Sequence, residues 1–132
     1  MFRYAAVTLS LVIVAFALGA QTPPVTGDRS TPLRPVSGEG NVGISNAVLR
    51  DQPEVRALRV MVDAGGVRAN HAHADVKFHL FVPISGVMTL ELEGAAPVQV
   101  QPWHPYYMQG GTQHGFRNPG STPVEIMEIF VK

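Results

Sequence analysis

Short apolar segments separated by turn residues run from Asn41 to the end of the chain, and no window of a dozen residues has a helical period. Segments of this length, divided by glycine, proline, asparagine and aspartate, are typical of an all-β sandwich or barrel. The predicted strands are residues 44–49, 55–62, 76–84, 87–93, 98–101, 106–108, 113–117 and 124–131, with a turn at 63–66. The sequence therefore predicts one antiparallel β-domain over residues 41–132.

The alternation of side chains assigns faces to two of these strands. In GVMTLELEG, Glu91 and Glu93 share one face with Val87 and Thr89. The residues on the opposite face should therefore point into the core, and they are Met88, Leu90 and Leu92. In VKFHLFVPI, apolar residues occupy both faces, which predicts that neither face is freely solvated. Such a strand lies either in the middle of a sandwich or beneath a second subunit, and we expect a homodimer.

The first twenty residues, MFRYAAVTLSLVIVAFALGA, have the pattern of a secretory signal peptide. Arg3 precedes an apolar run over residues 5–18, and small residues close the segment at Gly19 and Ala20. The run is shorter than the roughly 20 apolar residues that a membrane span needs. We expect cleavage near Ala20, export to the periplasm or the medium, and no stable membrane span afterwards. An uncleaved anchor is the alternative.

Residues 21–40 are predicted to be a flexible, proline-rich leader. The stretch QTPPVTGDRSTPLRPVS contains four prolines and no hydrophobic period. The chain has no cysteine, which excludes a disulfide framework and a lipoprotein anchor. Without residues 1–20 and their one arginine, nine basic residues stand against ten acidic ones, a net charge of about −1. This charge gives no reason to expect nucleic-acid binding.

Three of the five histidines stand in HAHADVKFH, residues 71–79. His71 and His73 share one face of an extended segment, so both imidazoles can converge on a single ion. Imidazole nitrogen binds divalent metals at about 2.0–2.1 Å. A further imidazole, His114, follows in QGGTQHGFRN. The pattern predicts a histidine-rich metal site.

The glycines around these histidines make the chain resemble the cupin superfamily. The first cupin motif has the form G, five residues, H-x-H, three or four residues, E, six residues, G. Here five residues separate Gly65 from His71, and six residues separate His79 from Gly86. The resemblance covers residues 41–132 and implies a small antiparallel barrel of the jelly-roll, or double-stranded β-helix, type.

The second cupin motif has the form G, five residues, P-x-G, two residues, H, three residues, N. Its last part is matched by Gly111, His114 and Asn118. Its leading glycine is replaced by Trp103 and its proline by Gln109. We expect Asn118 to fix the turn at Asn-Pro-Gly rather than to contact a ligand.

The family holds one metal with two histidines and the glutamate of the first motif and with the histidine of the second. In this chain no glutamate follows His73 within the first motif, and His79 takes its place after five residues. The implied ligands are therefore His71, His73, His79 and His114. Asp75 is the alternative fourth ligand, because it has the parity of the first two histidines in an extended segment.

A shell of four neutral imidazoles would leave the full double positive charge on the metal. That charge favours anionic ligands and the ionisation of bound water. The cofactor is expected to be one divalent transition metal, and iron, copper, zinc, nickel and manganese all remain open.

The large side chains inside the predicted barrel are candidates for the lining of a substrate pocket: Phe81, Met88, Tyr106 and Phe116. From the resemblance we expect a metal-dependent dioxygenase, isomerase or lyase that acts on a small anionic molecule. The alternative is a metal-binding or small-ligand-binding protein outside the cytoplasm that has no turnover.

Overall fold

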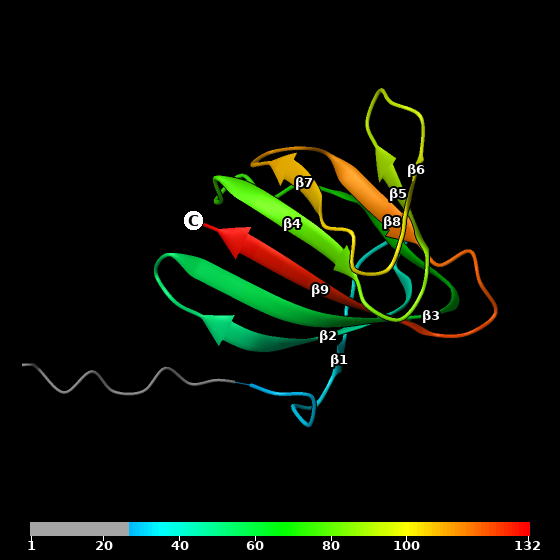
Figure 1. Cartoon of the computed structure of the whole chain (residues 1–132), viewed down its shortest axis with the longest axis horizontal. Helices are drawn as coiled ribbons and strands as arrows, with labels where there is room; N and C mark the ends of the chain where they lie inside the picture. Colours follow the sequence, from blue (N-terminus) through cyan, green and yellow to red (C-terminus); the bar gives the residue numbers. More distant parts are fainter. Residues whose placement is uncertain (1–26) are drawn as a thin grey trace, which may run out of the picture.

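The computed structural model describes residues 27–132, which form nine β-strands and no helix (Figure 1). The strands are β1 (Arg34–Pro35), β2 (Val42–Asp51), β3 (Val55–His71), β4 (Phe78–Pro83), β5 (Met88–Leu92), β6 (Val98–Val100), β7 (Tyr106–Gln109), β8 (His114–Arg117) and β9 (Val124–Val131). The predicted signal peptide and residues 21–26 of the predicted leader lie outside the described residues. Within residues 27–132, no helix is long and apolar enough to cross a membrane.

The strands form one antiparallel sheet that curls into a nearly closed barrel. Its order is β6-β5-β8-β3-β9-β4-β7, and β2 pairs with β3 and with β1. In Figure 1, β2, β3, β9 and β4 lie side by side on one wall, and β8 and β5 lie on the other. The prediction of an all-β antiparallel barrel is confirmed.

Strand β3 links the two walls, because its first part pairs with β9 and its last part with β8. The sequence predicts a turn at residues 63–66, whereas the structure continues the strand through them to His71. Gly65 adopts a positive φ of 70°, and a Cβ on Gly66 would lie 2.9 Å from the carbonyl oxygen of Asp63. These two glycines let the strand bend sharply without leaving the sheet.

The described part of the predicted leader, residues 27–40, is attached to the barrel. Strand β1 lies in it and pairs with β2, with Arg34 opposite Asn46. The amide of Gly27 donates to the carbonyl of Leu49 at 2.7 Å, and the amide of Val36 donates to Ile44. A proline-rich composition does not reveal this attachment, because it depends on an edge strand that is distant in sequence.

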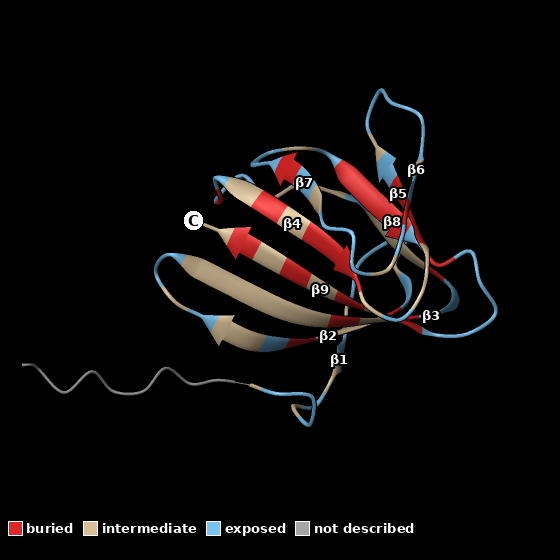
Figure 2. Ribbon diagram, viewed as in Figure 1, coloured by how far each residue is buried: buried red, intermediate tan, exposed pale blue. Residues whose placement is uncertain are grey.

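Apolar side chains fill the interior of the barrel. Buried and half-buried residues alternate along β9, as Figure 2 shows, so every second side chain of that strand points inward. Met88 and Leu90 are fully buried and Leu92 packs against the core, as predicted for this strand. The core cluster is Ile44, Val60, Val62, Phe81, Met88, Leu90, Val100, Met108, Phe116, Val124 and Ile126.

Three of the four residues predicted to line a pocket belong to this core. Phe81, Met88 and Phe116 are at most 1% exposed, and Tyr106 packs against the cluster. The ring centroids of Phe81 and Phe116 are 5.1 Å apart. Full burial of each such side chain stabilises the fold by about 1.5–3 kcal/mol.

Candidate metal centre

Four imidazoles gather inside the barrel. They come from the end of β3, the segment after it, β4 and the start of β8: His71, His73, His79 and His114. His71 is directly opposite His114 in the β3–β8 ladder. The ring centroids of this pair are 4.4 Å apart, and those of His73 and His114 are 5.5 Å apart. The structure therefore brings together all four histidines that the sequence nominates.

Backbone carbonyls fix the tautomer of two of these rings. The Nδ1 of His71 donates to the carbonyl of Ala69 at 2.9 Å, and that of His114 donates to Thr112 at 2.8 Å. A carbonyl oxygen only accepts, so in each neutral ring Nδ1 carries the proton and Nε2 keeps its lone pair. A metal-binding histidine commonly has this arrangement, because the outer hydrogen bond orients the ring.

A carboxylate joins the imidazoles from β9. Glu128 is 6% exposed, and its Oε1 lies 3.5 Å from Nε2 of His79. At this distance the two atoms do not form a well-made hydrogen bond. Glu128 was not predicted from the sequence, which indicates four imidazoles with Asp75 as the alternative carboxylate.

Several polar atoms in this centre are buried without a hydrogen-bond partner in the described chain. They are Nε2 of His73, both ring nitrogens of His79, Nε2 of His114 and Oε1 of Glu128. Buried polar atoms in native proteins nearly always have hydrogen-bond partners. Several neighbouring buried atoms without partners therefore need an explanation. The Glu128 oxygen and one nitrogen of each neutral ring can donate an electron pair to a cation.

The spacing of the donors fits a metal ion. One donor atom from each of His71, His73 and His114 lies within 4.8 Å of the others, and the same holds for His79, His114 and Glu128. His114 belongs to both groups, and neither group holds His71 or His73 together with His79 or Glu128. The donor set of imidazole and carboxylate suits a divalent transition metal, so the residues present fit the cofactor that the sequence predicts.

The protonation states in this centre also suit metal binding. Loss of solvation on burial lowers the pKa of His73 and that of His114 to about 4, and burial also lowers the pKa of His71. Burial is the largest single influence and would raise the pKa of Glu128, but the interactions with His79, His73 and His71 together outweigh it and leave that pKa lowered. Near neutral pH, the three histidines are therefore neutral and the glutamate is ionised, as metal ligation requires.

Asp75 and His104 lie apart from this centre. Asp75 is exposed, stands in the turn between β3 and β4, and belongs to neither donor group. The strand ends at His71, so the parity argument that nominated Asp75 does not extend to it. His104 is exposed and its Nδ1 lies 2.9 Å from the carbonyl of Pro102.

A phenylalanine and an arginine flank the imidazoles. The Phe130 ring stacks on His79 with centroids 4.4 Å apart and meets His73 edge-on at 4.5 Å. The guanidinium carbon of Arg56 lies 4.7 Å from the centroid of the Phe130 ring. The Nε of Arg56 is buried and has no hydrogen-bond partner in the described chain. A cationic side chain with an unused donor is thus present beside the ring that covers the centre.

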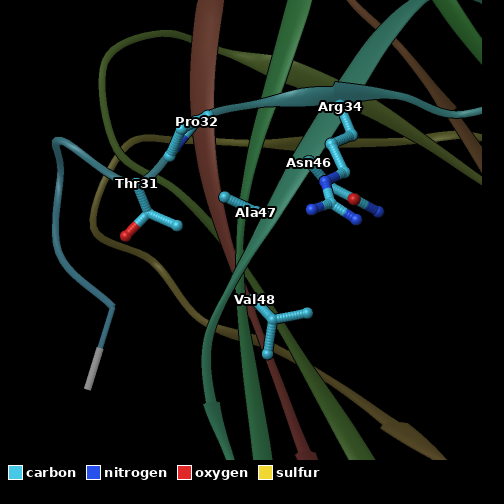
Figure 3. Close-up of a pocket in the computed structure, with 6 residues that line it drawn as sticks. All are labelled: Thr31, Pro32, Arg34, Asn46, Ala47 and Val48. Atoms are coloured by element: carbon cyan, nitrogen blue, oxygen red, sulfur yellow. The ribbon is translucent and has the colours of Figure 1, made fainter. Parts of the chain in front are cut away.

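A separate hollow lies between the segment around β1 and strand β2. Figure 3 shows its lining, which comprises Thr31, Pro32, Arg34, Asn46, Ala47 and Val48. None of the four clustered histidines lines this hollow. This hollow is therefore separate from the histidine cluster inside the barrel.

Comparison with known proteins agrees with this architecture. The sequence profile described as the Cupin domain matches residues 58–130. The solved structure of KdgF from Halomonas sp. is similar, with 20% identity, coverage of 84% of this chain and 96% of that chain, and a TM-score of 0.67. No curated protein matches the sequence.

Two further solved structures are similar. A predicted oxalate decarboxylase from Thermotoga maritima has 18% identity, with coverage of 81% of this chain and 97% of that chain and a TM-score of 0.70. A cupin domain from Bordetella pertussis has 27% identity, with coverage of 72% and 99% and a TM-score of 0.60. At these identities the similarity concerns the fold.

Proposed function

We propose that this chain, which belongs to the cupin family, binds one divalent transition metal ion through His71, His73, His79 and His114. The observation that carries the proposal is the set of buried imidazole nitrogens without hydrogen-bond partners. The carbonyls of Ala69 and Thr112 hold two of the rings with Nε2 unprotonated.

The proposed activity is that of a metal-dependent dioxygenase, isomerase or lyase acting on a small anionic molecule. A bound divalent ion in such a site supplies Lewis acidity, which stabilises negative charge developing on a ligand oxygen. The family membership supports an enzyme of this kind, and the similar structure from Thermotoga maritima is described as a predicted oxalate decarboxylase, which would act on a small anion.

Arg56 supports the anionic character of the ligand. Its guanidinium stacks on Phe130, which in turn contacts His73 and His79. Guanidinium groups bind carboxylates with two parallel hydrogen bonds. Within residues 27–132, the guanidinium of Arg56 takes part in no ion pair. The apolar part of such a ligand would pack against the ring of Phe130.

Metal content of the purified mature protein tests the proposal. We expect close to one equivalent of a transition metal in the wild type and a large loss in His73→Ala. His104→Ala is the matched control, because it removes an exposed imidazole outside the centre. A wild type that neither contains nor takes up a transition metal would overturn the proposed function.

A binding protein without turnover is the second candidate. Trp103 and Gln109 stand where the second motif has glycine and proline, so the chain departs from the family pattern. Incubation of the metal-loaded protein with a panel of small keto and phenolic acids separates the candidates. Product formation or oxygen consumption supports the enzyme, and tight binding without either supports the carrier.

Export to the periplasm or the medium and a homodimeric state complete the proposal. The first rests on the signal-peptide pattern of residues 1–20, and the second on the apolar residues on both faces of residues 76–84. Sequencing of the mature N-terminus checks cleavage near Ala20. Light scattering during size-exclusion chromatography checks the dimer.

A further inference from the structure

We propose that Glu128 coordinates the metal ion and supplies, from the last strand of the barrel, the carboxylate that the first cupin motif lacks in this chain. This inference rests on the metal site proposed above. Glu128 shares a donor group with His79 and His114, so it adds a carboxylate on the side of the centre that these two imidazoles form and changes the charge of the centre.

The position of Glu128 is the first support. It lies on the inward face of β9, with Ile126 and Phe130 as its neighbours on that face, and both of these residues are fully buried. Glu128 itself is 6% exposed, so its carboxylate has little access to bulk water. It faces His79 across the β4–β9 ladder, where Phe81 is its direct backbone partner.

The lack of a lysine or arginine partner is the second support. Within residues 27–132, no lysine or arginine nitrogen lies within 4.0 Å of the Glu128 carboxylate, and its Oε1 has no hydrogen-bond partner. A buried carboxylate without a cation or several donors is strongly unfavourable. A metal ion between the imidazoles and Glu128 would remove this deficit.

Glu125 on the same strand shows what a satisfied carboxylate looks like in this fold. It points outward, and its two oxygens pair with Arg59 at 2.7 Å and with Arg29 at 2.9 Å. The two glutamates therefore differ in their partners although they share a strand. Glu125 forms ion pairs with two arginines. The group within 4.0 Å of the Glu128 carboxylate is instead the imidazole of His79, which could itself bind a metal.

Coordination by Glu128 would lower the formal charge of the centre by one unit relative to four neutral imidazoles. A carboxylate ligand reduces the Lewis acidity of the ion and its attraction for anions. Recognition of an anionic ligand would then depend more on Arg56 and less on the ion. The site would combine histidines from β3, the segment after it, β4 and β8 with one carboxylate from β9.

Metal affinity of Glu128→Gln tests the inference, with Glu125→Gln as the control that removes the same charge from the outer face of the same strand. Competition with a chromophoric chelator for Co²⁺ and Zn²⁺ gives the dissociation constants. We expect at least an approximately tenfold weaker affinity in Glu128→Gln, since even outer-shell partners commonly contribute about 10–100-fold. We expect Glu125→Gln to stay within about twofold of the wild type.

Infrared difference spectra give a second readout, and the measurement on the wild type does not depend on the folding of any variant. Addition of Zn²⁺ to the apo protein should shift a carboxylate stretching band, and this shift should persist in Glu125→Gln and vanish in Glu128→Gln. Unchanged affinity in Glu128→Gln, or no carboxylate shift in a wild type that binds metal, would overturn this inference and leave the histidine site standing. A wild type that takes up no metal would overturn both.

Discussion

Nε2 of His79 lies 3.5 Å from Oε1 of Glu128, and the two residues come from neighbouring strands, β4 and β9. In that ladder His79 is opposite Phe130 and Glu128 is opposite Phe81, so the two polar side chains are diagonal neighbours on the inner face. The register of the two strands thus determines whether the carboxylate reaches the imidazoles. A slip by one residue would turn Glu128 outward.

The backbone of Trp103 gives a first prediction. Trp103 has a φ of 63°, it is the one non-glycine residue of the described chain with a positive φ, and it stands where the second motif has glycine. This conformation costs a residue with a Cβ about 1–2 kcal/mol. Its side chain is 71% exposed, so the ring contributes little packing. We predict that Trp103→Gly raises the free energy of unfolding by about 0.5–1 kcal/mol.

Urea denaturation checks this effect, with Trp103→Ala as the matched control. The alanine variant removes the same ring but keeps the strained conformation, so its stability should stay within about 0.5 kcal/mol of the wild type. The two variants would be equally stable if the backbone conformation carried no strain.

Much of the fold could be predicted from local patterns. Alternation in residues 87–93 predicts β5, and a short apolar segment after the turn residues at 118–123 predicts β9, because both signals are local to the strand. The spacing in HAHADVKFH and the glycines around it located the histidines, since ligands close in sequence leave a motif. The structure agrees with the sequence where the information is local.

The rest depends on pairing between distant segments. β1 forms because β2 offers an edge, and the second half of β3 forms because β8 pairs with it. Glu128 has no motif around it. The one signal that could have found it is its parity in VEIMEIFV, where it is the acid on a face otherwise made of Val124, Ile126 and Phe130.

Phe81 gives a second prediction, which separates a core role from a pocket role. The side chain is fully buried and its ring packs 5.1 Å from that of Phe116. Phe81→Ala should therefore lower the free energy of unfolding by about 3–5 kcal/mol. Tyr107→Ala, at a position 56% exposed, should cost less than about 1 kcal/mol. A loss below about 1 kcal/mol in Phe81→Ala would instead favour an open pocket beside this ring.

Asn118 gives a third prediction, on the turn after β8. It is 2% exposed, and its Nδ2 lies 2.7 Å from the Thr122 carbonyl, 3.0 Å from that of Asp63 and 3.2 Å from that of Val62. Asn118→Ala leaves these buried acceptors without a donor and should cost about 2 kcal/mol or more. Asn118→Asp should cost at least as much near pH 7, because a carboxylate would face the same carbonyl oxygens.

Urea or thermal unfolding of these variants measures the loss. Asn70 is the control position, because it is exposed and its side chain makes no hydrogen bond within the described chain. Asn70→Ala should change stability by no more than about 0.5 kcal/mol. Equal stabilities of Asn118→Ala and Asn70→Ala would show that the turn does not depend on the Asn118 amide.

The buried histidines give a fourth prediction, on the pH dependence of the metal-free protein. In the fold, burial lowers the pKa of His73 and that of His114 to about 4, whereas an unfolded chain protonates histidine near 6.5. Between these values the unfolded state binds more protons than the folded state. The free energy of unfolding should therefore fall as the pH is lowered from about 6.5 towards about 4.

Two neighbouring groups with lowered pKa values, His71 and Glu128, do not reverse this fall in the free energy of unfolding. His71 has a pKa lowered by burial, so it acts in the same direction. The lowered pKa of Glu128 gives stability that is present above its ordinary value of 4.5 and is lost as the pH falls through the folded value. Above pH 4.5 the loss of stability therefore comes from the histidines, and the loss of stability that Glu128 causes occurs below that pH.

Urea midpoints in the presence of a chelator, at about pH 7.5, 6 and 5, measure the histidine window. His114→Gln should flatten the decline because it removes one of the groups that the unfolded chain protonates. His104→Gln should leave the slope unchanged, since His104 is exposed and makes no contact with the cluster. A midpoint that does not change across this window in the wild type would mean that the imidazoles are as accessible to protons in the folded barrel as in the unfolded chain.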